Sequence, residues 1–157
     1  MNFKIKSPAG LSKILKELKS KGKRVVFTNG CFDIIHSGHI AILSKAKRLG
    51  DILVVGLNSD SSVKSIKGSS RPVNNERDRA RVLASLYLVD YVTVFNEPTP
   101  EALVRRLKPD VLVKGGDWKR DDIVGSDIVK SYGGRVVRVP FVKGYSTTSI
   151  LKKLARS

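Results

Sequence analysis

Cysteine and long apolar runs are scarce in this chain of 157 residues, and their scarcity excludes whole classes of protein. A single cysteine, Cys31, excludes an internal disulfide and any C-x-x-C metal or redox motif. No apolar run approaches the about 18 to 20 residues needed to cross a bilayer. The start of the chain carries lysines throughout and lacks the long apolar stretch of a secretory signal, so we expect a cytoplasmic protein without a membrane partner.

Acidic residues and familiar nucleotide-binding motifs are also few. The chain has 14 acidic against 30 basic side chains, a net charge of +16, which can steer nucleic acid, membrane surfaces or small anionic substrates. Lysine and arginine are spread along every segment, without the basic stripe interleaved with aromatic residues that stacks bases, so we expect no specific nucleic-acid partner. The Walker A and G-x-G-x-x-G patterns are absent, which excludes the usual kinase loop and the dinucleotide fingerprint.

What is present is a regular alternation of apolar runs and helical patterns. Runs rich in β-branched residues predict strands at 24–28, 51–58, 90–95, 110–116 and 135–140. Helical spacing predicts helices at 11–21, 39–49, 74–86, 99–108, 121–132 and 146–156, with Ser7 and Thr99 as caps. The alternation predicts an α/β fold, a Rossmann-like open parallel sheet of about five strands with helices on both faces. We expect one domain over residues 1–157, with the N-terminal helix inside 1–22.

The predicted sheet also indicates where a ligand binds. In open parallel sheets, ligands bind beyond the carboxyl ends of the strands, where the strand order reverses. Polar and glycine-rich segments follow three of the predicted strands, which end at Thr28, Asn58 and Gly116. The functional residues are therefore expected just after these three positions.

His36 and His39 follow the first predicted strand and open the next helix. Residues three apart at a helix start project to the same side, so both imidazoles could donate hydrogen bonds to phosphate oxygens as charge builds on them. The free N–H groups there suit phosphate, and Gly30 lets a ligand approach the backbone closely. Three alternatives stay open: Asp33, His36 and His39 as metal ligands, Cys31 as a thiol nucleophile, or the histidines as structural residues of a turn.

Three further segments are candidates for phosphate binding. Residues 144–149 place three consecutive hydroxyls at the start of the last helix, more than a single cap requires. Residues 64–72 read as a basic, flexible loop that could clamp polyphosphate or simply be solvated. Gly115 and Gly116 allow a ring or a phosphate close to the backbone, or form a simple turn. No pair of carboxylates stands out for hydrolysis, so these segments favour phosphoryl or nucleotidyl transfer by positioning and charge neutralisation.

Several segments resemble a known family. "GCFDIIHSGHI", residues 30–40, resembles the G-x-F-D-x-x-H-x-G-H signature of the cytidylyltransferase-like nucleotidyltransferases, and "GYSTTSIL", residues 144–151, is similar to their second signature. Over about residues 24–155 the chain resembles one branch of them. That resemblance implies transfer of AMP from ATP to D-glycero-D-manno-heptose 1-phosphate, by direct in-line attack at the α-phosphorus. The products are ADP-heptose, for lipopolysaccharide and S-layer sugars, and pyrophosphate; Mg²⁺ accompanies ATP.

The resemblance, with the strand-end rule, implies roles for particular residues. His36 and His39 bind the ATP phosphates and stabilise the transition state, and Lys67 neutralises phosphate charge, so these three form the catalytic group. The nucleotide-binding residues are then Thr28, Asn29, Gly30, Cys31, Phe32, His36, His39, Gly116, Asp117, Tyr145, Ser146, Thr147 and Thr148. The substrate-binding residues are Asp33, Asn58, Lys67, Arg71 and Lys114. No protein ligand for a metal is predicted.

The chain departs from the family pattern in two ways. Leu151 stands where the second signature usually ends in arginine, with Lys152 and Lys153 following it. Many relatives are fused to a sugar kinase, for which this chain has no room, so we expect a separate kinase to supply the sugar 1-phosphate. A homodimer is common in the superfamily. The alternatives are a glycerol-3-phosphate cytidylyltransferase or similar nucleotidyltransferase, and a non-catalytic nucleotide- or nucleic-acid-binding protein.

Overall fold

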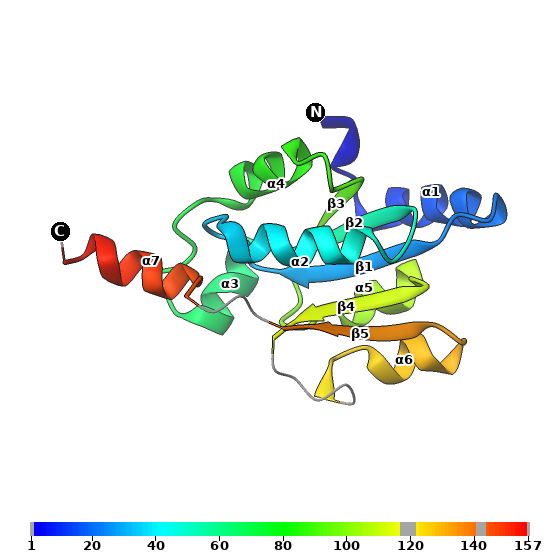
Figure 1. Ribbon diagram of the computed structural model, residues 1–157. Coiled ribbons are helices and arrows are strands. Elements are labelled where there is room, and N and C mark those ends of the chain that lie inside the picture. Colours follow the sequence, from blue (N-terminus) through cyan, green and yellow to red (C-terminus); the bar gives the residue numbers. More distant parts are fainter. Residues whose placement is uncertain (1, 117–121, 141–143, 157) are drawn as a thin grey trace.

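The computed structural model describes residues 2–116, 122–140 and 144–156, and its centre is a sheet of five parallel strands (Figure 1). The strands are β1 (Val25–Gly30), β2 (Ile52–Asn58), β3 (Tyr91–Phe95), β4 (Val111–Gly115) and β5 (Arg135–Val139). Their order across the sheet is β3-β2-β1-β4-β5, and each neighbouring pair is parallel. The predicted Rossmann-like parallel sheet is therefore confirmed.

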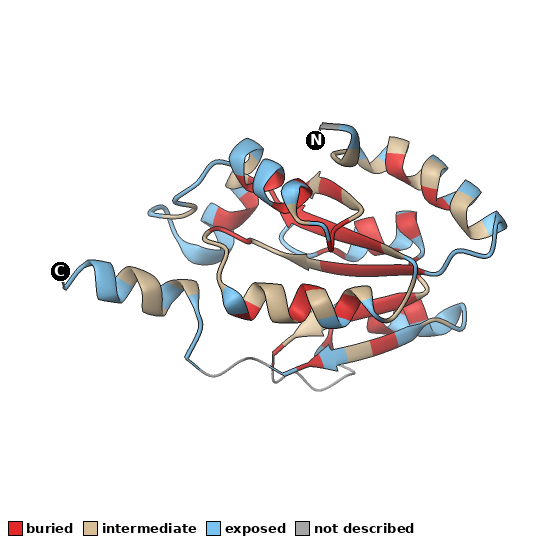
Figure 2. Ribbon diagram, turned by 45° about the horizontal axis from the view of Figure 1, so that its top comes forward, coloured by how far each residue is buried: buried red, intermediate tan, exposed pale blue. Residues whose placement is uncertain are grey.

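Helices cover both faces of the sheet because its strands are apolar on both sides. On one face α2 (Ser37–Lys47) and α4 (Glu76–Ser85) pack on side chains such as Val26 and Val113. On the other face α1 (Pro8–Ser20), α5 (Glu101–Leu107) and α6 (Ser126–Ser131) pack on Phe27 and Leu112. Figure 2 shows the buried residues concentrated on the strands and on the inner sides of these helices. Successive residues of each strand thus enter alternate cores, as the pleat requires.

Most of the predicted helix boundaries follow from capping. Ser7 caps α1 by accepting from the Gly10 amide, with Pro8 in the first turn, as predicted. The prediction of Thr99 as a cap is wrong, because α5 begins after Pro100, which makes no side-chain cap. The helix predicted at 121–132 is shorter than expected, since Gly125 adopts a left-handed conformation and α6 begins only at Ser126.

The segment predicted as a basic flexible loop is partly helical. Residues 64–67 form the end of α3 (Asp60–Lys67), and the loop begins at Gly68. Ser59 caps this helix by accepting from the Ser62 amide, and Asp60 in the first turn complements the helix dipole. The serine-rich sequence concealed a short helix whose stability comes from these caps and from the buried Val63.

The carboxyl ends of the strands meet at one edge of the sheet, and the strand order reverses there between β1 and β4. The last helix, α7 (Thr147–Leu154), starts at this edge and extends away from the sheet (Figures 1 and 2). It has no buried residue. Over the described ranges, no helix is long and apolar enough to cross a membrane.

Candidate functional site

A cleft of about 530 Å³ opens at the carboxyl edge of the sheet. The predicted site residues that line it are Asn29, Gly30, Cys31, Phe32, Asp33, His36, His39, Asn58, Lys67, Arg71, Lys114, Tyr145, Ser146, Thr147 and Thr148. They come from the ends of β1, β2 and β4, from the end of α3 and the loop after it, and from the starts of α2 and α7. The segments that the sequence singled out separately therefore share one cavity.

Two of the predicted nucleotide-binding residues that the structure describes fall outside this lining. The side chain of Thr28 is buried in the sheet, at 2% exposure. Gly116 is buried as well, and its amide already donates to the Val139 carbonyl at 2.9 Å, extending the β4–β5 pairing. Strand pairing at the edge of the sheet, which the sequence does not reveal, thus takes up the amide that we expected to meet the nucleotide. Asp117 lies outside the described residues.

The two histidines form a stacked pair at the N-terminus of α2. Their ring centroids are 3.8 Å apart with an interplanar angle of 24°. Phe32, held at a positive φ of 44°, places its ring 5.1 Å from that of His39. His36 occupies the N-cap position, but its side chain makes no cap hydrogen bond. The His39 and Ile40 amides donate to the His36 carbonyl at 2.9 and 3.2 Å, whereas the Ser37 and Gly38 amides have no partner among the described residues. These first two amides of α2 are therefore left for a ligand.

Gly38 lets the imidazole of His36 lie across the start of α2. A Cβ at this position would lie 3.0 Å from the Cε1 and Nδ1 atoms of His36, and 3.3 Å from the Cβ of Tyr145. Such contacts are tighter than ordinary van der Waals distances, so any larger residue would push the ring away. The glycine between the two histidines is thus explained by packing.

Burial keeps both histidines neutral at pH 7. Desolvation lowers the pKa of His36, and it lowers the pKa of His39 to about 4, helped by repulsion from His36 and opposed by a hydrogen bond to the Ile34 backbone. The Nδ1 atoms of both rings are buried without a hydrogen-bond partner among the described residues. Neutral imidazoles with unused nitrogens are prepared to respond to an anion, because a nearby negative charge favours the protonated form.

We expect His39 to titrate near pH 4 in the free protein and at a higher pH with a nucleoside triphosphate bound. The anion stabilises the imidazolium, so binding takes up protons and affinity rises as pH falls from about 6.5 towards 4. The same low pKa makes folding stability decline over that window, since the unfolded chain binds more protons there. NMR titration of the two imidazole signals, assigned with His36→Ala, measures this; a pKa near 6.5 that ATP leaves unchanged would contradict it.

Asp33 fixes the loop that follows α3. Its carboxylate accepts from Arg71 Nε at 2.7 Å and from the Val73 and Asn74 amides at 2.9 Å each. Burial raises the pKa of this carboxyl, but the two amides and the guanidinium outweigh burial, and the pKa lies below its ordinary value. These contacts direct the carboxylate of Asp33 to the loop, which does not support its reading as a metal ligand beside the histidines.

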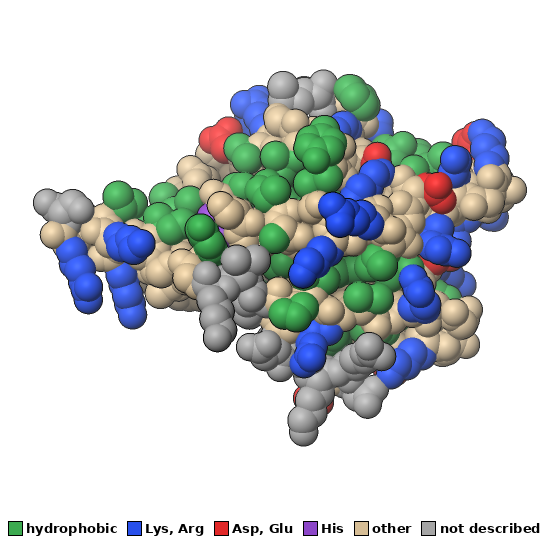
Figure 3. Space-filling view, in the orientation of Figure 1, with side chains coloured by type: hydrophobic (Ala, Val, Ile, Leu, Met, Phe, Trp, Pro, Cys, Tyr) green, Lys and Arg blue, Asp and Glu red, His purple; other side chains and the backbone are tan. Residues whose placement is uncertain are grey.

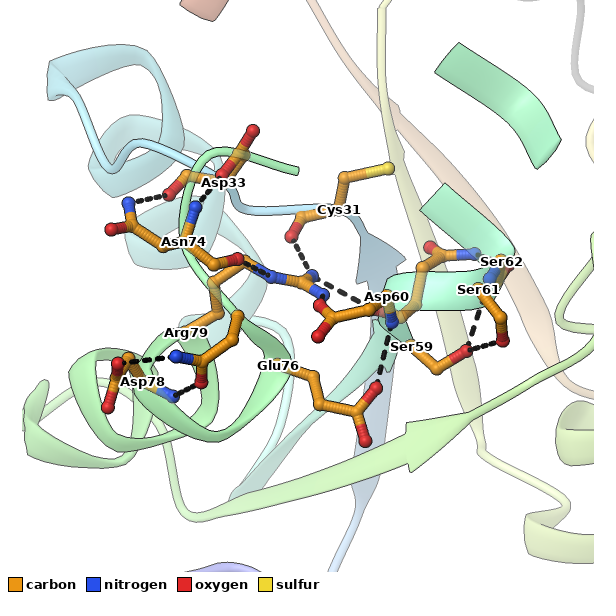
Figure 4. A network of polar contacts seen from close by, with 12 residues as sticks. Cys31, Asp33, Ser59, Asp60, Ser61, Ser62, Asn74, Glu76, Asp78 and Arg79 are labelled. Carbon is orange, nitrogen blue, oxygen red and sulfur yellow. Dashed lines mark hydrogen bonds and ion pairs between the residues drawn. The ribbon is translucent and has the colours of Figure 1, made fainter. Parts of the chain in front are cut away.

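Arg79, which the sequence analysis overlooked, ties the floor of the site together. Its guanidinium donates to the carbonyls of Cys31 at 2.6 Å, Asn58 at 2.8 Å and Asn74 at 2.9 Å, and to Asp60 Oδ1 at 2.7 Å (Figure 4). The residue is 2% exposed. One buried side chain thus joins the ends of β1 and β2, the start of α3 and the loop before α4. The sequence did contain an indication that Arg79 is buried, because helical spacing places it on the same face of α4 as the buried Leu83.

Two of the cations that line the cleft have no acidic partner among the described residues. Arg71 is paired with Asp33, whereas neither Lys67 nor Lys114 forms an ion pair with any described residue. Burial lowers the pKa of Lys114, and the positive charge of Lys67 lowers it further. Figure 3 shows lysine and arginine outnumbering acidic side chains on the face viewed. The cleft therefore carries positive charge that an anionic ligand would balance.

The start of α7 contributes hydroxyls to the cleft. Ser146 and Ser149 form a capping box, so their hydroxyls are used within the helix. Thr147 and Thr148 line the cleft, as Ser146 does. Lys152 and Lys153, which follow Leu151, are not among the described residues that line it.

An apolar wall that the sequence analysis did not predict completes the cleft. It comes from α3 and from the segments that precede α5 and α6. Its members are Ile66, Pro98, Pro100, Ile123 and Val124, and Thr99 lines the cleft between the two prolines. Ile66 and Val124 are 45% and 42% exposed, unusual for such side chains, so a ligand would cover apolar surface here. No motif marks these residues; only the fold brings them together.

Comparison with known proteins places the chain among relatives of similar sequence and fold. The family model described as "Cytidylyltransferase-like" matches residues 27–153. The chain is 54% identical to "Bifunctional protein HldE" of Geobacter metallireducens over 98% of its own length, and 56% identical to the protein of that name from Nitratiruptor sp. over 90%. It spans only 31% and 30% of the length of those two relatives.

Two solved structures share the fold. A "lipopolysaccharide core biosynthesis protein" from Thermoplasma volcanium is 32% identical with a TM-score of 0.64, covering 80% of this chain and all of its own. A pantoate-beta-alanine ligase from Francisella tularensis, solved with an ATP analogue and beta-alanine, has a TM-score of 0.62 at 17% identity, covering 98% of this chain and 78% of its own. The second likeness concerns the fold alone.

Proposed function

The chain belongs to the cytidylyltransferase-like family, and from that premise we propose that it is an adenylyltransferase that joins AMP to D-glycero-D-manno-heptose 1-phosphate. The products are ADP-heptose and pyrophosphate. The identity to proteins named HldE over nearly the whole chain supports this choice of substrates, as does the solved relative named for lipopolysaccharide core biosynthesis. A sugar kinase supplies the sugar 1-phosphate in this proposal.

The reaction is an in-line displacement at the α-phosphorus of ATP. An oxygen of the sugar phosphate forms the new P–O bond, the bond from the α-phosphorus to the α,β-bridging oxygen breaks, and pyrophosphate leaves with that electron pair. No covalent enzyme intermediate is needed, so the protein acts by positioning and by neutralising charge. This suits a cleft lined by histidines, lysines and hydroxyls, without an activated nucleophile: burial raises the pKa of the Cys31 thiol.

In this mechanism His36 and His39 stabilise the phosphate charge that grows as pyrophosphate leaves. The stacked, desolvated pair at the α2 N-terminus is the observation that carries the proposal. Imidazole N–H groups and the α2 amides donate to phosphate oxygens, in a site where low solvation strengthens each bond. The glycine-bearing end of β1, with Asn29, lies against the nucleotide, and Lys67 neutralises the phosphates.

We propose that Mg²⁺ arrives on the ATP phosphates. Among the described residues that line the cleft, the carboxylates are Asp33 and Asp122, and Asp33 is held by Arg71 and the loop amides. A site with so few oxygen ligands fits a cation that keeps its waters and is bound mainly by phosphate. The ion neutralises charge on the phosphates.

A grid of nucleotides and acceptors tests the proposal. Pyrophosphate release is measured with ATP or CTP, each with Mg²⁺ and either heptose 1-phosphate or glycerol 3-phosphate. We expect turnover with ATP and heptose 1-phosphate and little with the other pairs. Release only with CTP would assign a cytidylyltransferase instead. Salt-sensitive nucleic-acid binding without release from any pair would favour the non-catalytic alternative.

A further inference from the structure

Lys114 stands where the strand order reverses. It is the fourth residue of β4 and follows Val113, which pairs with Thr28 of β1, so the next step of this register brings it beside Asn29. Its Nζ lies 3.4 Å from Asn29 Oδ1, a long hydrogen bond to a neutral group. Both side chains line the cleft. Ligands of open parallel sheets bind at this point, so Lys114 is placed to touch whatever occupies the cleft.

The side chain of Lys114 approaches the cleft from the face of the sheet opposite the histidines. Residues two apart in a strand share a face, and Leu112 lies in the core under α1, α5 and α6. Helix α2, which carries His36 and His39, packs on the other face. A phosphate held above the carboxyl edge therefore has the histidines on one side and Lys114 on the other.

The ammonium group of Lys114 has no counter-ion of its own within the described ranges. The two arginines of the site are compensated, Arg71 by Asp33 and Arg79 by Asp60. A desolvated charge without a partner is costly, so proteins seldom keep one without a use. The positive charge of Lys67 disfavours the charged form of Lys114 as well. The missing negative charge is what a phosphate would supply.

We propose that Lys114 is a catalytic residue of the transfer, contacting a phosphoryl oxygen opposite the histidine pair. This role of Lys114 rests on the proposed function and goes beyond it. It implies that the phosphate charge is stabilised from both faces of the sheet, by the histidines on one face and by Lys114 on the other. The ammonium donates to the oxygen as charge redistributes, and Asn29 orients it. Removing one such donor from an active site lowers kcat by roughly 10²–10³-fold.

Steady-state kinetics of three variants tests the assignment. Lys114→Met keeps the length of the side chain and removes its charge, and we expect kcat to fall by about 10²-fold or more with a smaller change in KM for ATP. Lys114→Arg keeps the charge and should recover part of the loss. The matched control is Lys16→Met, which removes one charge from an exposed position on α1 and should leave both constants unchanged.

The pH profile separates a catalytic cation from a structural one. The pKa of Lys114 lies below its ordinary value, so kcat/KM should fall as alkaline pH deprotonates the side chain. In Lys114→Arg this alkaline limb of the pH profile should move to higher pH, because arginine stays protonated. Two groups act on the pKa of Lys114: the negative charge of Cys31 raises it, and the positive charge of Lys67 lowers it. Arg138 lies beside Lys114 on β5, and Asp122 lines the same cleft. The Cys31 thiol also titrates at alkaline pH, and its negative charge raises the pKa of Lys114, so Cys31→Ser should keep this fall of kcat/KM but move it to lower pH.

Calorimetric binding of ATP distinguishes failure of this inference from failure of the proposed function. If no substrate pair turns over, Lys114→Met should still bind ATP about tenfold or more weakly than the parent chain, since a charge-assisted contact is lost. Turnover and ATP affinity equal to the parent would overturn the role of Lys114 while leaving the proposed reaction standing. A pH limb that stays in place in Lys114→Arg would also count against it.

Discussion

Replacement of His39 by alanine is expected to lower kcat for pyrophosphate release by roughly 10²–10³-fold. His39 lies against both His36 and Phe32, with a pKa held near 4 by burial, so it is neutral before the substrates bind. As pyrophosphate leaves, negative charge grows beside the ring, and the imidazolium that the bound anion favours stabilises that charge more strongly than it stabilises bound ATP. Alanine removes the interaction in the transition state, so kcat should fall more than KM rises.

The stacking of the two rings leads to a second expectation, about the single and double alanine variants of His36 and His39. Because His36 and His39 act as one unit, each single alanine variant should lose nearly as much activity as the double variant, as groups that act together are not additive. Thermal unfolding serves as the control: loss of a half-buried ring costs on the order of 1 kcal/mol. His39→Gln, which keeps an N–H donor, should recover part of kcat. Full activity in either single variant would exclude the assignment.

The sequence predicted the sheet because each strand is apolar on both faces, a pattern that strongly specifies a covered parallel sheet. It predicted the histidine site for a similar reason, since the motif is local and its residues follow one strand end. The apolar wall around Ile66 and Pro98 was not predicted, because its members are unremarkable in sequence and only the packing of three segments assembles them. The fate of the Gly116 amide depended likewise on its neighbour, β5.

Arg79 shows a different limit of the sequence. A basic residue on a charged helix is normally read as solvated, and only its position on the stripe of α4 that carries Ala80 and Leu83 indicates burial. Its four hydrogen-bond partners are three carbonyls and a carboxylate, spread over three segments. Every residue has a backbone carbonyl, so no residue type indicates which carbonyls accept from Arg79. The network that holds the loop after β1 in place could therefore be found only in the structure.

Replacement of Arg79 by methionine should therefore be the most destabilising single change in the site. We expect it to lower the free energy of unfolding by about 3–5 kcal/mol. It leaves the carbonyls of Cys31 and Asn58 buried without a donor and Asp60 without its cation. With 5–15 kcal/mol of total stability typical, this is a large share, and Tm should fall by about 10 °C. Urea unfolding measures it.

Arg77→Met is the matched control, because Arg77 is exposed on the same helix and should change stability by no more than about 0.5 kcal/mol. Arg79→Lys keeps a charge but cannot reach four acceptors. Its free energy of unfolding should therefore lie between those of Arg79→Met and Arg77→Met. Activity adds the decisive readout. The Arg79 fork holds the backbone after β1 and β2, where the nucleotide and the sugar phosphate meet in the proposed reaction, so Arg79→Lys should lose kcat at temperatures where it remains folded. If Arg79→Lys is folded and its kcat is unchanged, Arg79 contributes to stability alone and does not position the reacting groups.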